Sequence, residues 1–212
     1  MKLLLTSAGL KNQTLIDEFL RLVGKPAKEI KVAYIPTAAN VEVGNKDWLI
    51  DNLYEFRQLV GEVDIVDVSS LKLEQFKPRL EWANAIVVGG GMSSYLYKQI
   101  VESGLSKILP KLLEDRVYVG ISAGSMVVGP DIDDELSQKY FNEKLGGGLG
   151  FVDFWIKPHM NSPYFSDRTP ELFAKIFKDT PKTVYALEDS TAVKVDGLKV
   201  TPLGEGKWVE FK

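Results

Sequence analysis

The segment VYVGISAGSMVVGP, residues 117–130, holds the first group that could do covalent chemistry. Ser122 follows a run of β-branched and aromatic residues, and glycines stand two positions before and after it, in the pattern G-x-S-x-G. A serine nucleophile at a sharp turn from a strand to a helix needs small neighbours there, because the two backbones approach closely. The amide of Ala123 would lie at the helix N-terminus and could bind an oxyanion. The pattern alone is equally consistent with a serine that is only a small residue at a tight turn and has no catalytic role.

His159 is the single histidine among 212 residues, and the chain has no cysteine. Any mechanism with an imidazole base must therefore use His159. Disulfides, thiolate metal sites, a cysteine nucleophile and zinc sites built on several histidines are excluded. A lone histidine is more often structural than catalytic, but His159 follows an apolar run and Pro158. We therefore expect it at the end of a strand, at the same edge of the sheet as Ser122, which favours catalysis.

The carboxylate that would orient His159 has several candidate positions. In the order serine, acid, histidine, it would come from DIDDE at residues 131–135 or from Asp153. DIDDE has the composition of a solvated loop, and it lacks the glycine and spacing of a calcium loop. Glu188 and Asp189, at the end of the apolar run in VYALEDSTAV, are the other candidates. A polar turn between two strands would have the same composition.

Three glycines at residues 89–91 end the buried run VVGGG, and Ser93 or Ser94 can cap the helix that follows. Such a turn can present backbone N–H groups to an anion. The segment does not match G-x-G-x-x-G, and no acidic residue ends a strand about 20 residues later, so a dinucleotide site is not predicted. No GK[ST] follows either, which argues against a phosphate-binding loop. A tight turn with close helix packing also explains the triplet.

The predicted secondary structure brings these groups to one sheet. Apolar runs that are continuous rather than alternating predict strands at 2–6, 31–36, 63–68, 84–90 and 117–122. Helical periodicity predicts a helix between Asn12 and Gly24, and further helices over 46–60, 94–103 and 105–114. Strands that alternate with helices at this spacing indicate an α/β fold with a parallel sheet covered on both faces.

The pattern changes after residue 130. The polar, glycine-rich residues 131–150 predict a surface loop with a short helix. A strand at 151–159 and a helix at 169–179 follow, with Pro170 in the first turn of that helix. From residue 183 the chain breaks into short strands at turns that contain DG and GEG. These turns predict an antiparallel meander at one end of the sheet.

The length and composition are those of one ordinary globular domain over 1–212, with 45% apolar and 26% charged residues. A net charge of −3 gives no electrostatic reason to expect nucleic acid or an anionic membrane as a partner. No run approaches the roughly 20 apolar residues that span a bilayer. The three leucines near the start are too few for a signal peptide, so we expect a cytoplasmic protein.

Four segments together resemble the dipeptidase E and cyanophycinase family of serine peptidases, also called aspartyl dipeptidases. They are VVGGGMSSYL, GISAGSMVVGP, KPH and ALEDSTA, in this order, and the resemblance extends over nearly the whole chain. It implies a three-layer α/β/α fold related to class I glutamine amidotransferases, with a mostly parallel central sheet. It also implies a serine in place of cysteine at the turn, and a triad in the order serine, histidine, acid.

By this resemblance Ser122 is the nucleophile and His159 the general base. The acid falls on Asp189, with its neighbour Glu188 as the alternative, and the amides of Gly90 and Ala123 form the oxyanion hole. The implied chemistry is hydrolysis of short peptides through an acyl-enzyme, without a metal or an organic cofactor.

In dipeptidase E the substrate is a dipeptide with an N-terminal aspartate, which implies a cation near the site. Arg168 is our candidate for this cation. The alternative interpretation is that Arg168 is an ordinary surface arginine beside a helix. Met92 stands where the family usually has asparagine. Met92 and the choice of acid leave a second hypothesis, a non-catalytic member that binds a small acidic ligand. A third is an amidase or esterase with the same turn. The partner we expect is a small peptide, with neither nucleic acid nor a membrane.

Overall fold

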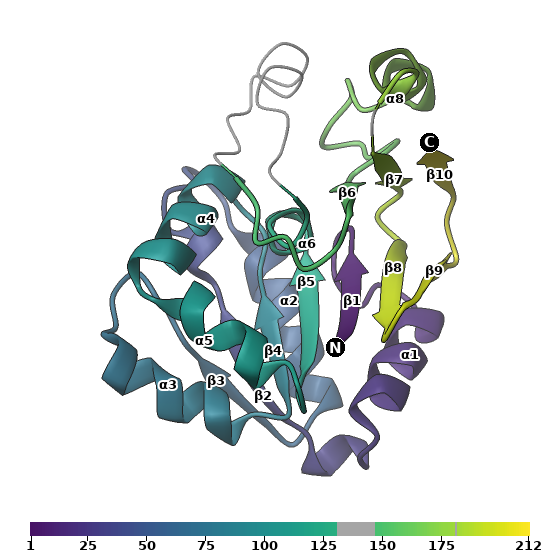
Figure 1. Cartoon of the computed structure of the whole chain (residues 1–212). Helices are drawn as coiled ribbons and strands as arrows, with labels where there is room; N and C mark the ends of the chain where they lie inside the picture. Colours follow the sequence, from purple (N-terminus) through teal and green to yellow (C-terminus); the bar gives the residue numbers. More distant parts are fainter. Residues whose placement is uncertain (131–146, 181) are drawn as a thin grey trace.

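The computed structural model describes residues 1–130, 147–180 and 182–212 of the chain. Its strands form a seven-stranded sheet in the order β3-β2-β4-β5-β1-β8-β9 and a three-stranded sheet in the order β10-β7-β6 (Figure 1). The strands are β1 (Lys2–Thr6), β2 (Lys31–Ile35), β3 (Glu62–Ile65), β4 (Ala85–Val88), β5 (Val117–Ile121), β6 (Phe154–Lys157), β7 (Thr183–Leu187), β8 (Thr191–Asp196), β9 (Lys199–Gly204) and β10 (Trp208–Phe211).

Helices lie between the parallel strands in sequence. They are α1 (Gln13–Val23), α2 (Asp47–Leu59), α3 (Leu73–Trp82), α4 (Ser93–Glu102), α5 (Leu105–Leu112), α6 (Ala123–Met126) and α8 (Pro170–Phe177), with short 3₁₀ turns η1 (Ala27–Glu29) and η2 (Thr37–Ala39). The first of these helices has the ends that the sequence predicts. The Asn12 side chain accepts a hydrogen bond from the backbone N–H of Leu15, and Gly24 closes the helix with φ 69°.

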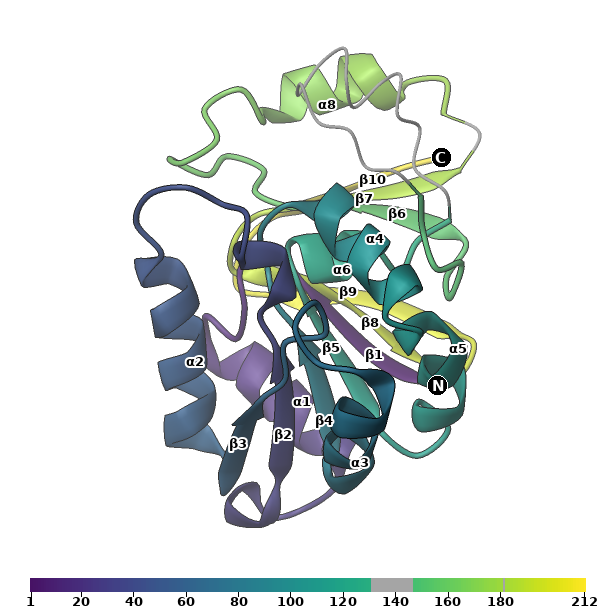
Figure 2. The same ribbon diagram turned by 90° about the vertical axis from the view of Figure 1, so that its left-hand side faces the viewer.

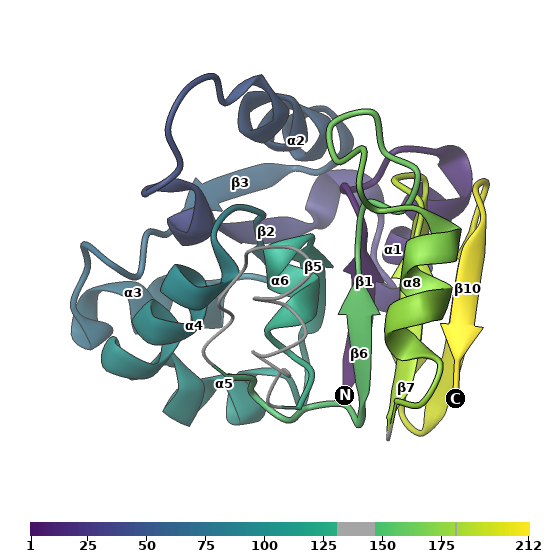
Figure 3. The same ribbon diagram turned by 90° about the horizontal axis from the view of Figure 1, so that it is seen from above.

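The strands from β3 to β1 in this order are parallel to one another, and every residue of β4 and β5 is buried. Burial on both sides follows because helices cover both faces of the sheet. Viewed from above, α2 lies on one side of the sheet and α4 and α5 lie on the other (Figure 3). The predicted three-layer α/β/α fold with a mostly parallel central sheet is therefore confirmed.

The sequence patterns did not predict α3. Only Phe76 and Leu80 of its ten residues are buried, and Pro78 lies inside the helix. The apolar periodicity is therefore weak, and proline is unfavourable in the interior of a helix. The helix forms because Phe76 and Leu80 complete the apolar core on the face of the sheet that α4 and α5 also cover.

The predicted antiparallel strands of the C-terminal part are divided between two sheets. β8 and β9 continue the central sheet as antiparallel strands, whereas β10 pairs antiparallel with β7 in the second sheet. β6 joins β7 in parallel. The second sheet has an apolar core of its own, in which Trp155 and Val184 are buried together with Phe177 of α8. Figure 2 shows this sheet and α8 above the carboxyl ends of the central strands.

Two further expectations concern the chain as a whole. Most of the segment for which the sequence predicts a surface loop with a short helix, residues 131–146, lies outside the described residues. In the part of the chain that the structure describes, no helix is long and apolar enough to cross a membrane.

Candidate active site

Ser122 lies directly after β5 and is the N-terminal cap residue of α6, with φ 50° and ψ −109°. A positive φ is uncommon for a residue with a side chain and costs free energy, so the surrounding structure must hold it. The Ser122 amide donates to the carbonyl oxygen of Thr6 at 3.1 Å, and the Met126 amide donates to the Ser122 carbonyl oxygen at 3.0 Å. The predicted sharp turn from strand to helix is therefore present, and its backbone is tied to β1 and α6.

The two glycines of G-x-S-x-G are required by close packing. A Cβ atom on Gly124 would overlap the carbonyl oxygen of Val88 in the neighbouring strand. A Cβ atom on Gly120 would lie 2.7 Å from the Gly124 carbonyl oxygen. The small residues therefore let α6 approach the ends of β4 and β5, which fixes where the Ser122 side chain points.

We predict that Gly124→Ala lowers the free energy of unfolding by about 2–3 kcal/mol, because the added methyl group meets backbone that cannot move freely. Urea denaturation measures the change. Gly150→Ala is the control, since Gly150 has φ 66° and open space around its Cβ position. That variant should lose only about 1 kcal/mol to backbone strain. Equal losses in both variants would show that the contact with β4 is not tight.

His159 follows β6 and Pro158 and reaches the Ser122 hydroxyl. Its Nε2 lies 2.8 Å from Ser122 Oγ, and its Nδ1 lies 2.6 Å from Asp189 Oδ1. The backbone of His159 is in the left-handed region, with φ 66°. The structure thus brings together Ser122, His159 and Asp189, which the sequence places 37 and 30 residues apart.

The carboxylate of Asp189 follows β7 and is held from several sides. Ser162 donates to Oδ2 at 2.7 Å, and the Ser7 hydroxyl lies 3.2 Å from Oδ1. Burial raises the pKa of Asp189, but the hydrogen bonds from His159, Ser162 and Ser7 and the charge interaction with His159 outweigh it, so the pKa lies below its ordinary value. An ionised carboxylate only accepts hydrogen bonds, so Nδ1 of His159 carries the proton and Nε2 can accept from Ser122.

The other candidate acids point elsewhere. Glu188 accepts a hydrogen bond from the Asn161 side-chain amide at 2.9 Å and one from the Lys207 backbone amide at 2.8 Å. The Asp153 side chain is 87% exposed and pairs with Lys182. Residues 131–135 lie outside the described residues. Among the described carboxylates, Asp189 is therefore the one in contact with His159.

Gly90 and Ala123, whose amides are the predicted oxyanion-hole donors, both lie next to Ser122. Ala123 is the first residue of α6, and a Cβ atom on Gly90 would lie 3.3 Å from the Ser122 Cβ atom. Gly91 has φ 128°, and any side chain there would overlap the Ala38 carbonyl oxygen. Within the described part of the chain, neither the Gly90 nor the Ala123 amide donates a hydrogen bond. Both are therefore free to bind an oxyanion.

An aromatic ring that the sequence patterns did not indicate packs on the histidine. Phe165 stacks on the His159 ring at 4.6 Å between centroids, with an interplanar angle of 17°. Arg168, the predicted substrate-binding cation, is 8% exposed and holds its guanidinium carbon 4.2 Å from the Phe165 ring centroid. It also donates to the Pro158 carbonyl oxygen at 3.3 Å. Arg168 thus lies against the loop that carries His159 and not on an exposed helix flank.

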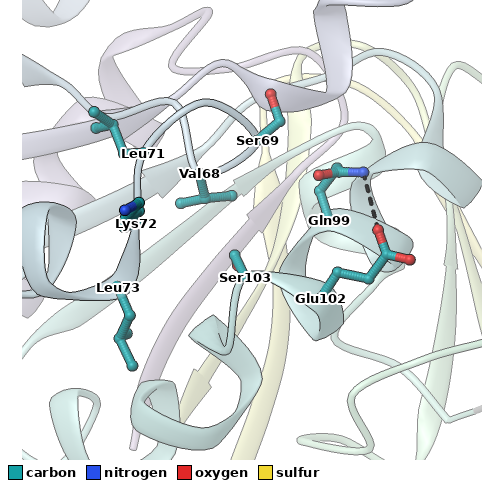
Figure 4. A pocket seen from close by; sticks show the side chains of 8 residues that line it. All are labelled: Val68, Ser69, Leu71, Lys72, Leu73, Gln99, Glu102 and Ser103. Atoms are coloured by element: carbon teal, nitrogen blue, oxygen red, sulfur yellow. Dashed lines mark hydrogen bonds between the residues drawn. The ribbon is translucent and has the colours of Figure 1, made fainter.

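A cavity of about 360 Å³ lies apart from these residues (Figure 4). It lies between the loop after β3, the start of α3 and the end of α4, and it is lined by Val68, Ser69, Leu71, Lys72, Leu73, Gln99, Glu102 and Ser103. Its serines have no histidine beside them, since the single histidine of the chain contacts Ser122. Among the described residues, no group of three or more histidine, aspartate or glutamate side chains could hold a metal ion. The candidate chemistry is therefore concentrated at Ser122.

A serine at a sharp turn from a parallel strand to a helix, hydrogen-bonded to a histidine that in turn contacts an aspartate, is the arrangement typical of serine hydrolases. Comparison with known proteins narrows this class. The sequence model of peptidase family S51 matches residues 3–203 of this chain. The chain belongs to peptidase family S51 and is a serine-type peptidase.

Three similar proteins agree with this assignment. An uncharacterized peptidase of Pasteurella multocida is 29% identical over 155 residues, which cover 70% of this chain and 73% of that protein. Peptidase E of Actinobacillus pleuropneumoniae is 29% identical over 149 residues, or 68% of this chain and 63% of that protein. The crystal structure of a Listeria monocytogenes protein assigned as a peptidase E has the same fold. Its TM-score is 0.79 at 23% identity, with 97% of this chain and 98% of that chain covered.

Proposed function

We propose that this peptidase cleaves short peptides through an acyl-enzyme formed on Ser122, with His159 as the general base and Asp189 as the orienting acid. The observation that carries the proposal is the continuous hydrogen-bonded chain between the three side chains, with distances of 2.8 Å and 2.6 Å. The first distance is within the range that proton transfer from a nucleophile to its base requires, and the second is that of the hydrogen bond by which an acid orients the base.

The first half of the reaction forms the acyl-enzyme. His159 Nε2 takes the hydroxyl proton while Ser122 Oγ attacks the carbonyl carbon of the peptide bond. The carbonyl oxygen becomes an oxyanion, which the amides of Gly90 and Ala123 bind. The C–N bond then breaks, and the proton on Nε2 goes to the leaving amine. Asp189 stays ionised throughout and stabilises the imidazolium form of His159.

The second half releases the acid product. A water molecule gives a proton to His159 Nε2 and attacks the ester carbon, so a second oxyanion forms in the same place. The bond to Ser122 Oγ breaks, and Nε2 returns the proton to the serine. One water molecule is consumed per peptide bond, and the enzyme returns to its starting protonation state.

Dipeptides with an N-terminal aspartate are the first substrates that we propose. The proteins named peptidase E among the relatives support this choice, as does the resemblance of the four sequence segments to the dipeptidase E family. Arg168 is our candidate for the cation that balances the aspartate, because its guanidinium lies beside Phe165, the ring that stacks on His159. A cation behind an aromatic ring would act on the substrate over a longer distance than a direct ion pair.

A fluorophosphonate probe and a panel of substrates test the proposal together. We expect the probe to label the intact protein once, on the peptide that contains Ser122, as measured by mass spectrometry. We also expect Asp-Xaa dipeptides to be hydrolysed faster than other dipeptides, simple amides and esters. A protein that is neither labelled nor able to hydrolyse any of these substrates would be a ligand-binding member without activity. Turnover of esters without turnover of peptides would make it an esterase.

A further inference from the structure

We propose that Ser7, together with Ser162, is a positioning residue that keeps the side chains of Asp189 and His159 aligned with the Ser122 hydroxyl. This inference rests on the proposed function, because it assigns a task within the same site. Ser7 directly follows β1 and is fully buried. Ser7 therefore follows a strand of the central sheet, whereas Asp189 and His159 follow strands of the second sheet.

The Ser7 hydroxyl contacts both partners of the acid–base pair. Its oxygen accepts a hydrogen bond from the backbone amide of His159 at 2.8 Å. It also lies 3.2 Å from Asp189 Oδ1 and 3.3 Å from the Leu187 carbonyl oxygen, and its single proton can be donated to one of these at a time. The Ser7 amide donates to the Thr191 carbonyl oxygen at 3.0 Å, which fixes Ser7 itself.

The backbone of His159 needs such support. With φ 66° it is in a region that side chains disfavour, so it persists only where neighbouring groups hold it. The bond from its amide to Ser7 fixes one end of the residue, and the Met160 amide, which donates to the Leu187 carbonyl oxygen at 2.9 Å, fixes the next peptide group. Rotation of this backbone would swing the imidazole away from Ser122.

Ser162 holds the second oxygen of the acid. Its hydroxyl donates to Asp189 Oδ2 at 2.7 Å, and its amide donates to the His159 carbonyl oxygen at 3.2 Å. Each carboxylate oxygen of Asp189 therefore has a serine hydroxyl within hydrogen-bond distance, besides the imidazole on Oδ1. This arrangement prevents the carboxylate from turning, so Oδ1 stays aimed at Nδ1 of His159.

The chain contains a matched hydroxyl outside the site. Thr37 is also fully buried; its Oγ1 donates to Asp67 Oδ1 at 2.8 Å and accepts from the Val68 amide at 3.1 Å. Like Ser7, Thr37 thus has a hydroxyl that accepts from a backbone amide and lies within hydrogen-bond distance of an aspartate. Thr37 follows β2, whereas Ser7 follows β1. Thr37→Val measures what the loss of such a buried hydroxyl costs in stability without touching Asp189 or His159.

The single histidine makes the test unambiguous, because protein labelled with ¹⁵N-histidine gives the imidazole signals of His159 alone. We expect Ser7→Ala and Ser162→Ala each to move or broaden the Nδ1 proton resonance, and Thr37→Val to leave it unchanged. We also expect kcat to fall about 10- to 100-fold in Ser7→Ala with little change in KM, as misplacement of a reacting group does.

A double-mutant comparison separates positioning from a loss of stability. In the Asp189→Asn background, Ser7→Ala should lower kcat less than about twofold, because the group that it positions is already impaired. The proposal would be overturned if Ser7→Ala lowered kcat by the same factor in both backgrounds. It would also be overturned if folded Ser7→Ala kept the wild-type kcat and the wild-type Nδ1 proton resonance. If Ser7→Ala does not fold, Ser7→Cys keeps the volume and weakens the bonds. An unchanged Nδ1 proton resonance in Ser7→Cys or in Ser162→Ala would also contradict the proposal.

The resonance does not depend on turnover, which keeps the two proposals distinguishable. If the wild-type protein neither reacts with a fluorophosphonate nor hydrolyses peptides, the proposed function fails. The NMR spectra of the same variants would still show whether Ser7 and Ser162 position the acid and the imidazole.

Discussion

Ser122→Ala is expected to lower kcat for peptide hydrolysis by roughly 10⁶-fold and to abolish labelling by a fluorophosphonate, as loss of the nucleophile does in other serine hydrolases. The variant keeps the histidine, the carboxylate and both oxyanion-hole amides. It removes only the oxygen that forms the covalent bond. What remains is the small acceleration from binding and from the oxyanion hole alone.

The expected loss is chemical and not structural. The hydroxyl of Ser122 has a hydrogen bond to His159, while its amide and carbonyl groups make the bonds that hold the turn. The melting temperature should therefore stay within a few degrees of wild type. Ser125→Ala is the matched control, since Ser125 is a buried serine of the adjoining helix α6 whose hydroxyl donates to the Thr6 carbonyl oxygen. It should still be labelled. Labelling of Ser122→Ala would place the nucleophile elsewhere.

Asp189→Asn is expected to lower kcat by about 10⁴-fold, the size of the effect in the serine-protease template. The asparagine can turn its amide nitrogen toward Nδ1 of His159, and that nitrogen donates a hydrogen bond. The imidazole proton then moves to Nε2, which can no longer accept the proton of Ser122. Steady-state kinetics on the best dipeptide measures the loss, and the fluorophosphonate labelling rate should fall with it.

Glu188→Gln is the control for this effect, because it removes the charge of the neighbouring carboxylate and keeps its shape. Glu188 binds the Asn161 side chain and the Lys207 amide, and a glutamine oxygen can replace one of these acceptors. We expect kcat within about threefold of wild type, with a small loss of stability. A full loss in Glu188→Gln with an unaffected Asp189→Asn would mean that the acid in the reacting protein is Glu188.

Much of the fold follows from local patterns. The strands of the central sheet are short apolar runs between helices, and α1 has both a capping asparagine and a terminal glycine. Such signals depend on neighbouring residues only, so a single sequence displays them. α3 lacks them, since tertiary packing of two side chains overrides a proline within the helix. The separate second sheet also depends on packing between strands that are distant in the chain.

The candidate site divides in the same way. Ser122 and its glycines form a local pattern. His159 can be identified without a pattern, because the chain has no other histidine. Asp189 and Glu188 are adjacent in sequence, and only the three-dimensional structure shows which of them contacts the imidazole. Ser7 and Ser162 carry no sequence signal, because their contacts with Asp189 join segments that follow different strands. Phe165 lies in the same loop as His159, but no residue pattern indicates that the two rings stack.

The division of the reactive groups between two sheets has a consequence for biosynthesis. Ser122 follows β5 of the central sheet, whereas His159 and Asp189 follow β6 and β7 of the second sheet. During translation the nucleophile therefore leaves the ribosome before its base and its acid. A nascent chain that has folded only its N-terminal strands presents an unactivated serine. If the proposed triad is correct, peptidase activity therefore begins only after the C-terminal strands have docked on the central sheet.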